Sequence, residues 1–145
     1  MKLPEYITLQ EVKRVCKELK IRDWTKLKKP QVTVQEARII LPHVNTEKMM
    51  IPLEDFKIGL EVELEHGLMF KQYNVTNNHP LLTGKIVMAH FMEMLDYYKR
   101  LEVAEIEGDL LKAVTAKNMD KIQKYYKKLT KATIVLGKTE AGQLK

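Results

Sequence analysis

The chain has 145 residues, of which 45% are hydrophobic, and it carries 25 lysines and arginines against 19 aspartates and glutamates. These values suit one globular domain and exclude a chain that is mostly disordered. No apolar run reaches the roughly 20 residues that a membrane span needs, residues 1–10 lack the apolar segment of a signal peptide, and a single cysteine excludes an internal disulfide. We therefore expect a protein of the cytoplasm of its host cell, without membrane contact.

The charge is distributed unevenly. Residues 1–29 hold nine basic and four acidic residues, residues 30–111 hold seven and thirteen, and residues 112–145 hold nine lysines and two acids. The acidic middle and the two basic ends can attract each other within the fold, or they can attract an outside partner. The alternative is a solvated surface of uneven charge.

Helical periodicity and capping signals predict about five to six helices and no strand. In chain order these are residues 8–20, capped by Thr8 with Cys16 in the core; 33–42, opened by Thr33 and Glu36; 53–67, closed by Gly67; 80–102; 103–114, after a kink near Gly108; and a helix capped by Asn118. Residues 133–145 show no period and are expected to be a tail or to pack back on the body. The fold class is all-α, a compact helical bundle with short flanking extensions.

We expect one domain over residues 1–145. Its core would be residues 53–102, with an N-terminal extension at residues 1–50 and basic C-terminal helices and a tail at residues 103–145.

Two pairs of an acid and a histidine fall in apolar rows of the predicted helices. The row of Leu53, Phe56 and Leu60 continues to Glu63, and His66 follows at the i+3 position. The row that begins at Ile86 contains the second such pair, which is His90 and Glu93.

A buried carboxylate costs several kcal/mol unless it is paired or coordinated. One explanation is a polar network in the core, made of Glu63, His66, His90, Glu93, Asp96 and Tyr97. A second is a divalent metal such as iron, manganese or zinc, with Glu63, His66, His90 and Glu93 as ligands, because helical bundles hold metals with glutamates and an E-x-x-H spacing. Acid–base catalysis is a third, and we assign no catalytic residue. His43 and His79 are expected to be exposed or capping residues.

Five lysines recur at helical spacing near the C-terminus: Lys117, Lys121, Lys124, Lys128 and Lys131. This basic face could contact phosphates, but it has no arginine for bidentate base contacts, and we expect no exposed aromatic to be interleaved with it for stacking. A solvated face, docking to an acidic protein surface and non-specific nucleic-acid binding therefore stay open. Glycine-rich phosphate loops, C-x-x-C, H-E-x-x-H and G-x-S-x-G are absent from the sequence, which argues against a nucleotide-using enzyme or a standard hydrolase.

Three blocks of sequence resemble a small uncharacterised helical family: residues 63–67 (ELEHG), residues 74–86 (NVTNNHPLLTGKI) and residues 89–101 (AHFMEMLDYYKRL). The resemblance covers roughly residues 53–102 and is to a domain of unknown function found in bacteria, phages and large DNA viruses. The chain departs from the family pattern at Asn78 and His79, where the family carries an acidic pair, and at Leu95, where it carries a proline.

From these observations we expect a non-enzymatic binding or structural protein that is encoded by a virus, docks to protein partners or a larger assembly, and is a minor component of the virion. The alternative is a metal-binding helical bundle with a site of glutamate and histidine ligands.

Overall fold

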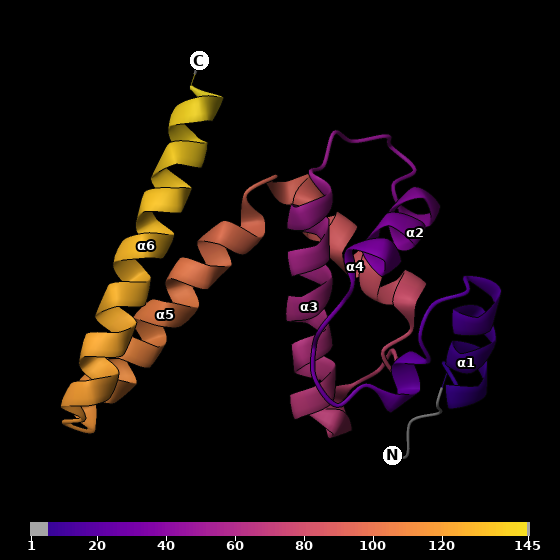
Figure 1. Ribbon diagram of the computed structural model, residues 1–145, viewed down its shortest axis with the longest axis horizontal. Helices are drawn as coiled ribbons and strands as arrows, with labels where there is room; N and C mark the ends of the chain where they lie inside the picture. Colours follow the sequence, from indigo (N-terminus) through magenta and orange to yellow (C-terminus); the bar gives the residue numbers. More distant parts are fainter. Residues whose placement is uncertain (1–5, 145) are drawn as a thin grey trace. The chain divides into compact units, whose positions relative to one another are not determined.

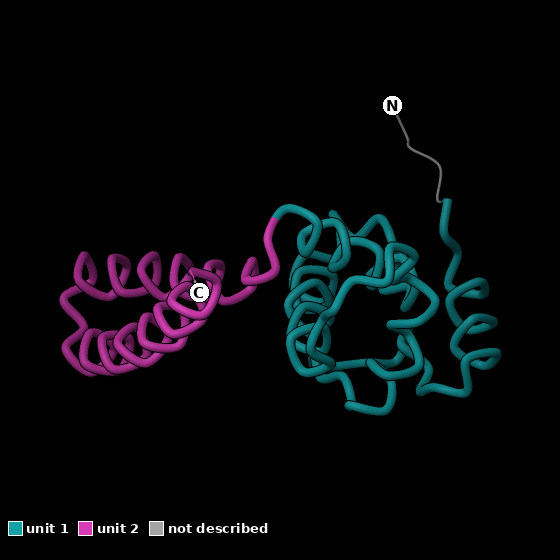
Figure 2. Tube along the Cα trace, turned by 90° about the horizontal axis from the view of Figure 1, so that it is seen from above, with its two compact units in different colours: residues 1–93 teal, residues 94–145 magenta. Residues whose placement is uncertain are grey.

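The computed structural model describes residues 6–144, and within that range it contains six α-helices, two short 3-10 helices and no strand (Figure 1). The predicted all-α class is confirmed. The chain divides into two compact units, unit 1 at Met1–Glu93 and unit 2 at Met94–Lys145 (Figure 2). The expected core at residues 53–102 crosses this boundary, and the single domain over the whole chain stays a prediction.

Unit 1 is built on three helices that contact one another in pairs: α2 (Val34–Val44), α3 (Leu53–Met69) and α4 (Pro80–Glu93). Helix α1 (Leu9–Glu18) contacts α4 and the 3-10 helix η1 (Trp24–Lys26), and a second 3-10 helix, η2 (Lys71–Tyr73), follows α3. Residues 9–44, expected to be an extension, thus supply two helices to unit 1 and much of its core. The fully buried side chains of unit 1 include Val12, Cys16, Trp24, Ile40, Phe56, Leu60, Leu64 and Val87.

The helix starts follow the capping chemistry of the sequence. The hydroxyl of Thr8 accepts from the Glu11 backbone N–H at 3.2 Å, and Thr33 and Glu36 form the predicted reciprocal capping box. His79, expected to be exposed or capping, is buried and caps α4, because its Nδ1 accepts from the backbone N–H groups of Leu81 and Leu82 at 3.2 and 3.3 Å. Burial lowers the pKa of His79, which suits a neutral ring that accepts hydrogen bonds.

Glu36 also ties the segment before α2 to the helix. Its carboxylate receives two hydrogen bonds from the Arg22 guanidinium, at 2.9 and 2.6 Å, and one from the indole of Trp24 at 3.2 Å. Burial by itself would raise the pKa of Glu36, but the bonds from Arg22, Thr33 and Trp24 outweigh it and lower the pKa to about 2. A charged carboxylate in the core is thus fully hydrogen-bonded.

The crossing of α2 and α4 depends on Gly84. A Cβ added there would lie 3.0 Å from Ile40 and 3.2 Å from Val44, which is closer than side chains normally approach. The face of α4 that is buried in unit 1 is therefore the one with Thr83, Gly84, Val87, Met88 and Phe91. The predicted inward row, from Ile86 through His90 to Glu93, lies beside this face rather than on it.

Unit 2 is a hairpin of α5 (Tyr97–Thr115) and α6 (Met119–Gln143), which contact each other along their length. Lys117 in the turn adopts a left-handed conformation (φ 51°), and the Asn118 side chain caps α6 by accepting from the Lys121 N–H at 3.0 Å. The Arg100 guanidinium holds the buried Asp96 carboxylate with two bonds, at 2.9 and 2.8 Å, and approaches Glu140 at 2.9 Å. These contacts attach the start of α5 to the end of α6.

Several predicted helix ends are wrong. The expected helix over residues 80–102 is interrupted at residues 94–96, where Asp96 is the N-cap residue of α5 and its carboxylate accepts from Arg100 instead of from the helix backbone. Helix α5 runs through Gly108 without ending, and α6 includes residues 133–143, which were expected to lack structure. His43 and Pro42 lie inside α2, which continues to Val44.

Within residues 6–144, no helix is both long enough and apolar enough to cross a bilayer.

Replacing Glu36 with glutamine should lower the free energy of unfolding of unit 1 by about 2–3 kcal/mol at neutral pH. Because the folded pKa lies below the unfolded value of 4.5, the stabilisation is present above pH 4.5 and is lost as the pH falls toward 2. Urea denaturation followed by fluorescence of Trp24, the chain's one tryptophan, measures the free energy of unfolding at neutral pH and its dependence on pH. The variant should lose less stability than wild type over this pH window. The exposed-site control Glu47→Gln should behave as wild type, and equal acid sensitivity of Glu36→Gln and wild type would contradict the assignment.

Candidate functional site

The structure brings Glu63 of α3 next to His90 of α4. Nε2 of His90 lies 3.5 Å from Oε1 of Glu63, and their side chains are 28% and 15% exposed. At this distance the imidazole supports the carboxylate as a polar neighbour when it is neutral and as an ion pair when it is protonated. The convergence of these two residues on neighbouring helices is as the sequence predicts, but it occurs at the edge of the core.

The other two residues of the predicted pairs are less enclosed. Nδ1 of His90 lies 3.9 Å from Glu93, whose side chain is 70% exposed. His66 is exposed and its ring stacks against Phe70, with the ring centroids 6.5 Å apart. His66 was expected to point inward, and this is wrong because α3 buries the row of Phe56, Leu60 and Leu64 and leaves His66 beyond its edge.

Asp96 and Tyr97 belong to unit 2. Asp96 is buried there against Arg100 and Gln143, and the Tyr97 ring packs edge-on against Tyr98 with their centroids 5.1 Å apart. The Arg100 guanidinium lowers the pKa of Asp96, so this carboxylate stays charged. Asp96 is thus satisfied inside the hairpin, which gives it a structural use that needs no shared network with Glu63.

The ligand geometry of the proposed metal can be tested on the four residues named for it. Across residues 6–144, no three His, Cys, Asp or Glu side chains gather closely enough to hold a metal ion. His66 stacks on Phe70, and His90 lies between two carboxylates that approach different ring nitrogens. A single metal bonded to one nitrogen could not use both carboxylates as they are placed, so the geometry favours the polar pair.

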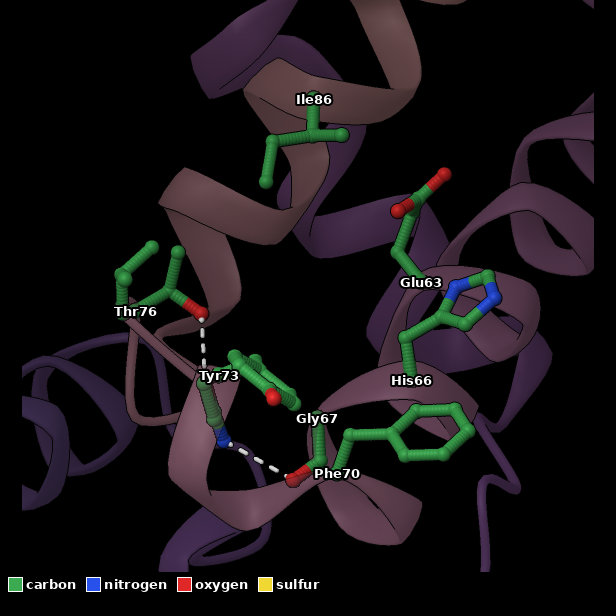
Figure 3. A pocket seen from close by; sticks show the side chains of 9 residues that line it. Glu63, His66, Gly67, Phe70, Tyr73, Thr76 and Ile86 are labelled. Atoms are coloured by element: carbon green, nitrogen blue, oxygen red, sulfur yellow. Dashed lines mark hydrogen bonds between the residues drawn. The ribbon is translucent and has the colours of Figure 1, made fainter.

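A pocket of about 210 Å³ opens beside Glu63, and all of its walls come from unit 1 (Figure 3). Helix α3 contributes one wall with Glu63 and His66, and Ile86 reaches the pocket from α4 (Figure 3). The connector between these helices contributes the opposite wall; the lining residues at the α3 end and on the connector are Gly67, Phe70, Tyr73, Asn74, Val75 and Thr76.

The connector is held against α3 by a small cluster of amides. Nδ2 of Asn74 donates to the Gly67 carbonyl at 3.1 Å and to Oδ1 of Asn78 at 2.9 Å, and Thr76 donates to Asn74 at 3.2 Å. A Cβ added to Gly67 would overlap Oδ1 of Asn78 and lie 3.0 Å from Asn74. Gly67 was expected to end the helix, but α3 continues to Met69 and the glycine instead permits this close approach.

The pocket combines an anionic group with apolar and aromatic surface. None of its nine lining residues is a lysine or an arginine, and Glu63 supplies a carboxylate that is mostly shielded from water. Tyr73 and Val75 remain 75% and 82% exposed at the opposite wall. A cationic group with an apolar stem fits this arrangement, because the stem can cover the apolar wall while the cation reaches the carboxylate.

The sequence analysis placed no site in this wall, because the segment at residues 70–80 (FKQYNVTNNHP) is mostly polar and shows no helical period. A signal was present, since Phe70, Tyr73 and Val75 place three large apolar side chains within six residues of a connector. All three stay exposed, and an exposed apolar cluster of this kind indicates a contact surface rather than a core.

The predicted basic face lies wholly in unit 2. Lys117 is in the turn, whereas Lys121, Lys124, Lys128 and Lys131 are exposed on α6. Lys128 and Lys131 line a groove of about 420 Å³ together with three acids of α5, which are Glu102, Glu105 and Asp109. Part of the basic face is therefore directed at acidic residues of the same hairpin, which weakens its potential for nucleic acid.

The comparisons with known proteins give a family but no activity. A family model described as "Protein of unknown function (DUF5661)" matches residues 12–107, so the chain belongs to this family. The match extends beyond the residues 53–102 of the expected resemblance on both sides, and it includes most of α1 and all of α2. No curated protein and no solved structure matches the chain.

Replacing Gly67 with alanine should displace Asn78 and Asn74 and open the connector wall. We expect the free energy of unfolding to fall by about 1–2 kcal/mol, because overpacking costs about 1–3 kcal/mol and the higher helix propensity of alanine returns part of it. The NMR chemical shifts of Tyr73 and Val75 should change as well, because both residues lie on the displaced connector. In Gly108→Ala, where an added Cβ meets nothing within 4 Å, stability should rise slightly instead. Unchanged stability and unchanged signals in Gly67→Ala would show that the close approach is not needed.

Elemental analysis of protein purified without an affinity tag tests the metal interpretation. We expect iron, manganese and zinc to be substoichiometric and the folded protein to be unaffected by a chelator, because no three ligands converge among residues 6–144. A stoichiometric metal in wild type that is lost in His90→Ala would contradict this expectation and support the metal interpretation.

Proposed function

We propose that this protein is a non-enzymatic docking protein whose unit 1 pocket takes a basic side chain, a lysine in the first instance, from a partner protein. The supporting observation is the pocket itself, in which a shielded carboxylate stands opposite exposed aromatic and apolar residues. Each part corresponds to one part of a lysine: Glu63 to the ammonium, and Tyr73, Val75 and Ile86 to the aliphatic stem.

The volume of the pocket favours a single side chain over a cofactor. At about 210 Å³ it is smaller than the roughly 300–1,000 Å³ of pockets that enclose drug-sized ligands. A side chain of a partner needs no larger space, since the rest of the partner lies on the surrounding surface. Met69, Phe70 and Tyr73 are exposed around the pocket and provide such a surface.

The charge of the pocket favours a cationic group of the partner over an anionic one. His90 lies 3.5 Å from Glu63 on the side of α4 and can hold the carboxylate in place without a lysine or arginine of this chain. A carboxylate positioned in this way by its own protein is prepared for an incoming cation, so less ordering is needed on binding. An anionic partner group would instead meet Glu63 with no lysine or arginine in the lining to compensate.

No reaction is needed to account for these residues. The pocket holds no serine or cysteine nucleophile among its lining side chains, and Glu63 and His90 are explained as an anchor and its support. If the chain is virus-encoded, the partner would be a neighbouring protein of the particle.

The proposal can be tested by NMR titration of the full chain with N-acetyl-lysine methylamide. We expect weak binding, with a Kd of about 1 mM, and shifts concentrated at Tyr73, Val75 and Ile86. Glu63→Gln should raise the Kd about five- to tenfold, the equivalent of about 1–1.4 kcal/mol. The control Glu65→Gln removes an exposed carboxylate of the same helix that does not line the pocket, and it should leave the Kd unchanged.

A second probe isolates the ammonium. N-acetyl-norleucine methylamide has a similar aliphatic stem without the charge, and it should bind more weakly than the lysine probe. Equal binding of the two probes, or no shift at the three wall residues with either, would overturn the proposal.

A further inference from the structure

His79 lies at the point where the α3–α4 connector enters α4. The residue is buried, with 6% of its surface exposed, and its Nδ1 accepts from the backbone N–H groups of Leu81 and Leu82 at 3.2 and 3.3 Å. A ring nitrogen accepts only through a free lone pair, so Nδ1 carries no hydrogen and Nε2 carries the one hydrogen of the neutral ring. The cap of α4 therefore exists only while His79 is neutral.

Protonation of the His79 ring is unfavourable in its capping position. It places a hydrogen on Nδ1, which then faces two N–H groups instead of accepting from them. It also puts a positive charge at the N-terminus of a helix, where the helix dipole is already positive. Burial adds to both effects, because a buried charge without a partner loses its hydration. A protonated His79 is therefore more stable when the ring leaves this position and reaches water.

Two charged residues of α1 act on the His79 ring, and no other charged group among residues 6–144 does so. The Glu11 carboxylate favours the protonated ring, whereas the Arg14 guanidinium opposes it. These two groups are hydrogen-bonded to each other at 2.8 and 2.7 Å, so their effects on the ring partly cancel. Burial has the largest effect, and it lowers the pKa of His79 below the ordinary value of 6.5.

Hydrogen bonds connect this histidine to the wall of the unit 1 pocket. The His79 backbone N–H donates to the carbonyl of Thr76 at 3.0 Å, and Thr76 lines the pocket. Oδ1 of the preceding residue, Asn78, accepts from Nδ2 of Asn74 at 2.9 Å, and the same Nδ2 donates to the Gly67 carbonyl at 3.1 Å. The position of the connector against α3 therefore depends on where His79 is held.

The backbone just before His79 favours a change of path once the cap is lost. Asn77 and Asn78 both have left-handed backbone angles (φ 49° and 59°), which cost conformational energy even though asparagine tolerates them better than most residues. Such angles persist only where surrounding contacts hold them. The cap made by His79 is one of these contacts, so its loss allows the connector to relax away from α3.

We propose that His79 is a pH switch for the pocket: the neutral ring caps α4 and keeps the connector against α3, and the protonated ring leaves the cap and releases the connector wall. A partner's lysine is then bound at neutral pH and released in acid. This last step rests on the function proposed above, whereas the release of the connector does not.

Proton linkage gives the direction of the switch. The open form, in which the ring is exposed, binds a proton more readily than the closed form. Below pH 6.5, each unit of pH therefore favours the open form by up to about tenfold, and above pH 6.5 the closed form keeps its full advantage.

A pH titration of the full chain followed by NMR tests the switch. From about pH 7.5 to about pH 5, we expect the amide signals of Leu81, Leu82 and Thr76 to change together with the ring signals of His79. The indole signal of the buried Trp24 should keep its position, because the core stays folded while the connector opens. Amide signals that do not change would overturn the proposal. A Trp24 signal that changes in step with them would also overturn it, because unit 1 would then be unfolding as a whole.

The variant His79→Asn separates the switch from the histidines beside the pocket. Asparagine is a good N-cap residue that takes up no proton in this range, so the Leu81 and Leu82 signals of the variant should not depend on pH. The control His43→Asn makes the same change at an exposed histidine of α2, and it should leave the pH dependence of these signals as in wild type. Signals of Leu81 and Leu82 that titrate in His79→Asn as in wild type would overturn the proposal.

The lysine probe, N-acetyl-lysine methylamide, connects the switch to binding. From about pH 7.5 to about pH 5, its Kd should rise at least about threefold more for wild type than for His79→Asn, because only the wild type loses its binding-competent population. An equal rise in the two proteins would overturn the control of the pocket by His79. No lysine binding at neutral pH, with Leu81 and Leu82 signals that still titrate, would overturn the proposed function and support the switch alone.

Discussion

The close approach of the α3–α4 connector to α3 is the constraint on which the candidate site depends. It requires a residue without a Cβ at position 67, because Asn74 and Asn78 occupy the space that a side chain would take. The hydrogen bond from Asn74 to the Gly67 carbonyl then fixes the connector, and Asn77 and Asn78 accept left-handed backbone angles (φ 49° and 59°) that asparagine tolerates better than most residues. Without this contact, the helices would keep their core but Tyr73, Val75 and Thr76 would have no fixed place opposite Glu63.

Local signals in the sequence were sufficient for the helices and their starts. Thr8, Thr33 and Asn118 cap the helices that they were expected to cap, because a side-chain oxygen next to a backbone N–H is a short-range interaction. The interruption at residues 94–96 was not predictable from periodicity, since apolar residues continue across it as Met92, Met94 and Leu95. There the hydrophobic pattern points to one helix, while the contacts of Arg100 with Glu140 and of Asp96 with Gln143, at the end of α6, belong to tertiary structure.

The sequence also predicts part of the candidate site, namely its residues but not how deeply they are buried. Glu63 follows from the row of α3, and its proximity to His90 follows from the packing of neighbouring helices. The position of the pair at the edge of the core could not be predicted. Helix α4 is apolar on most of its surface, so its sequence pattern does not identify the face that is buried. Gly84 makes the selection by allowing Ile40 and Val44 of α2 to come close, and this turns His90 toward the edge of the core. A close approach of two helices that a glycine permits cannot be read from the spacing of apolar residues.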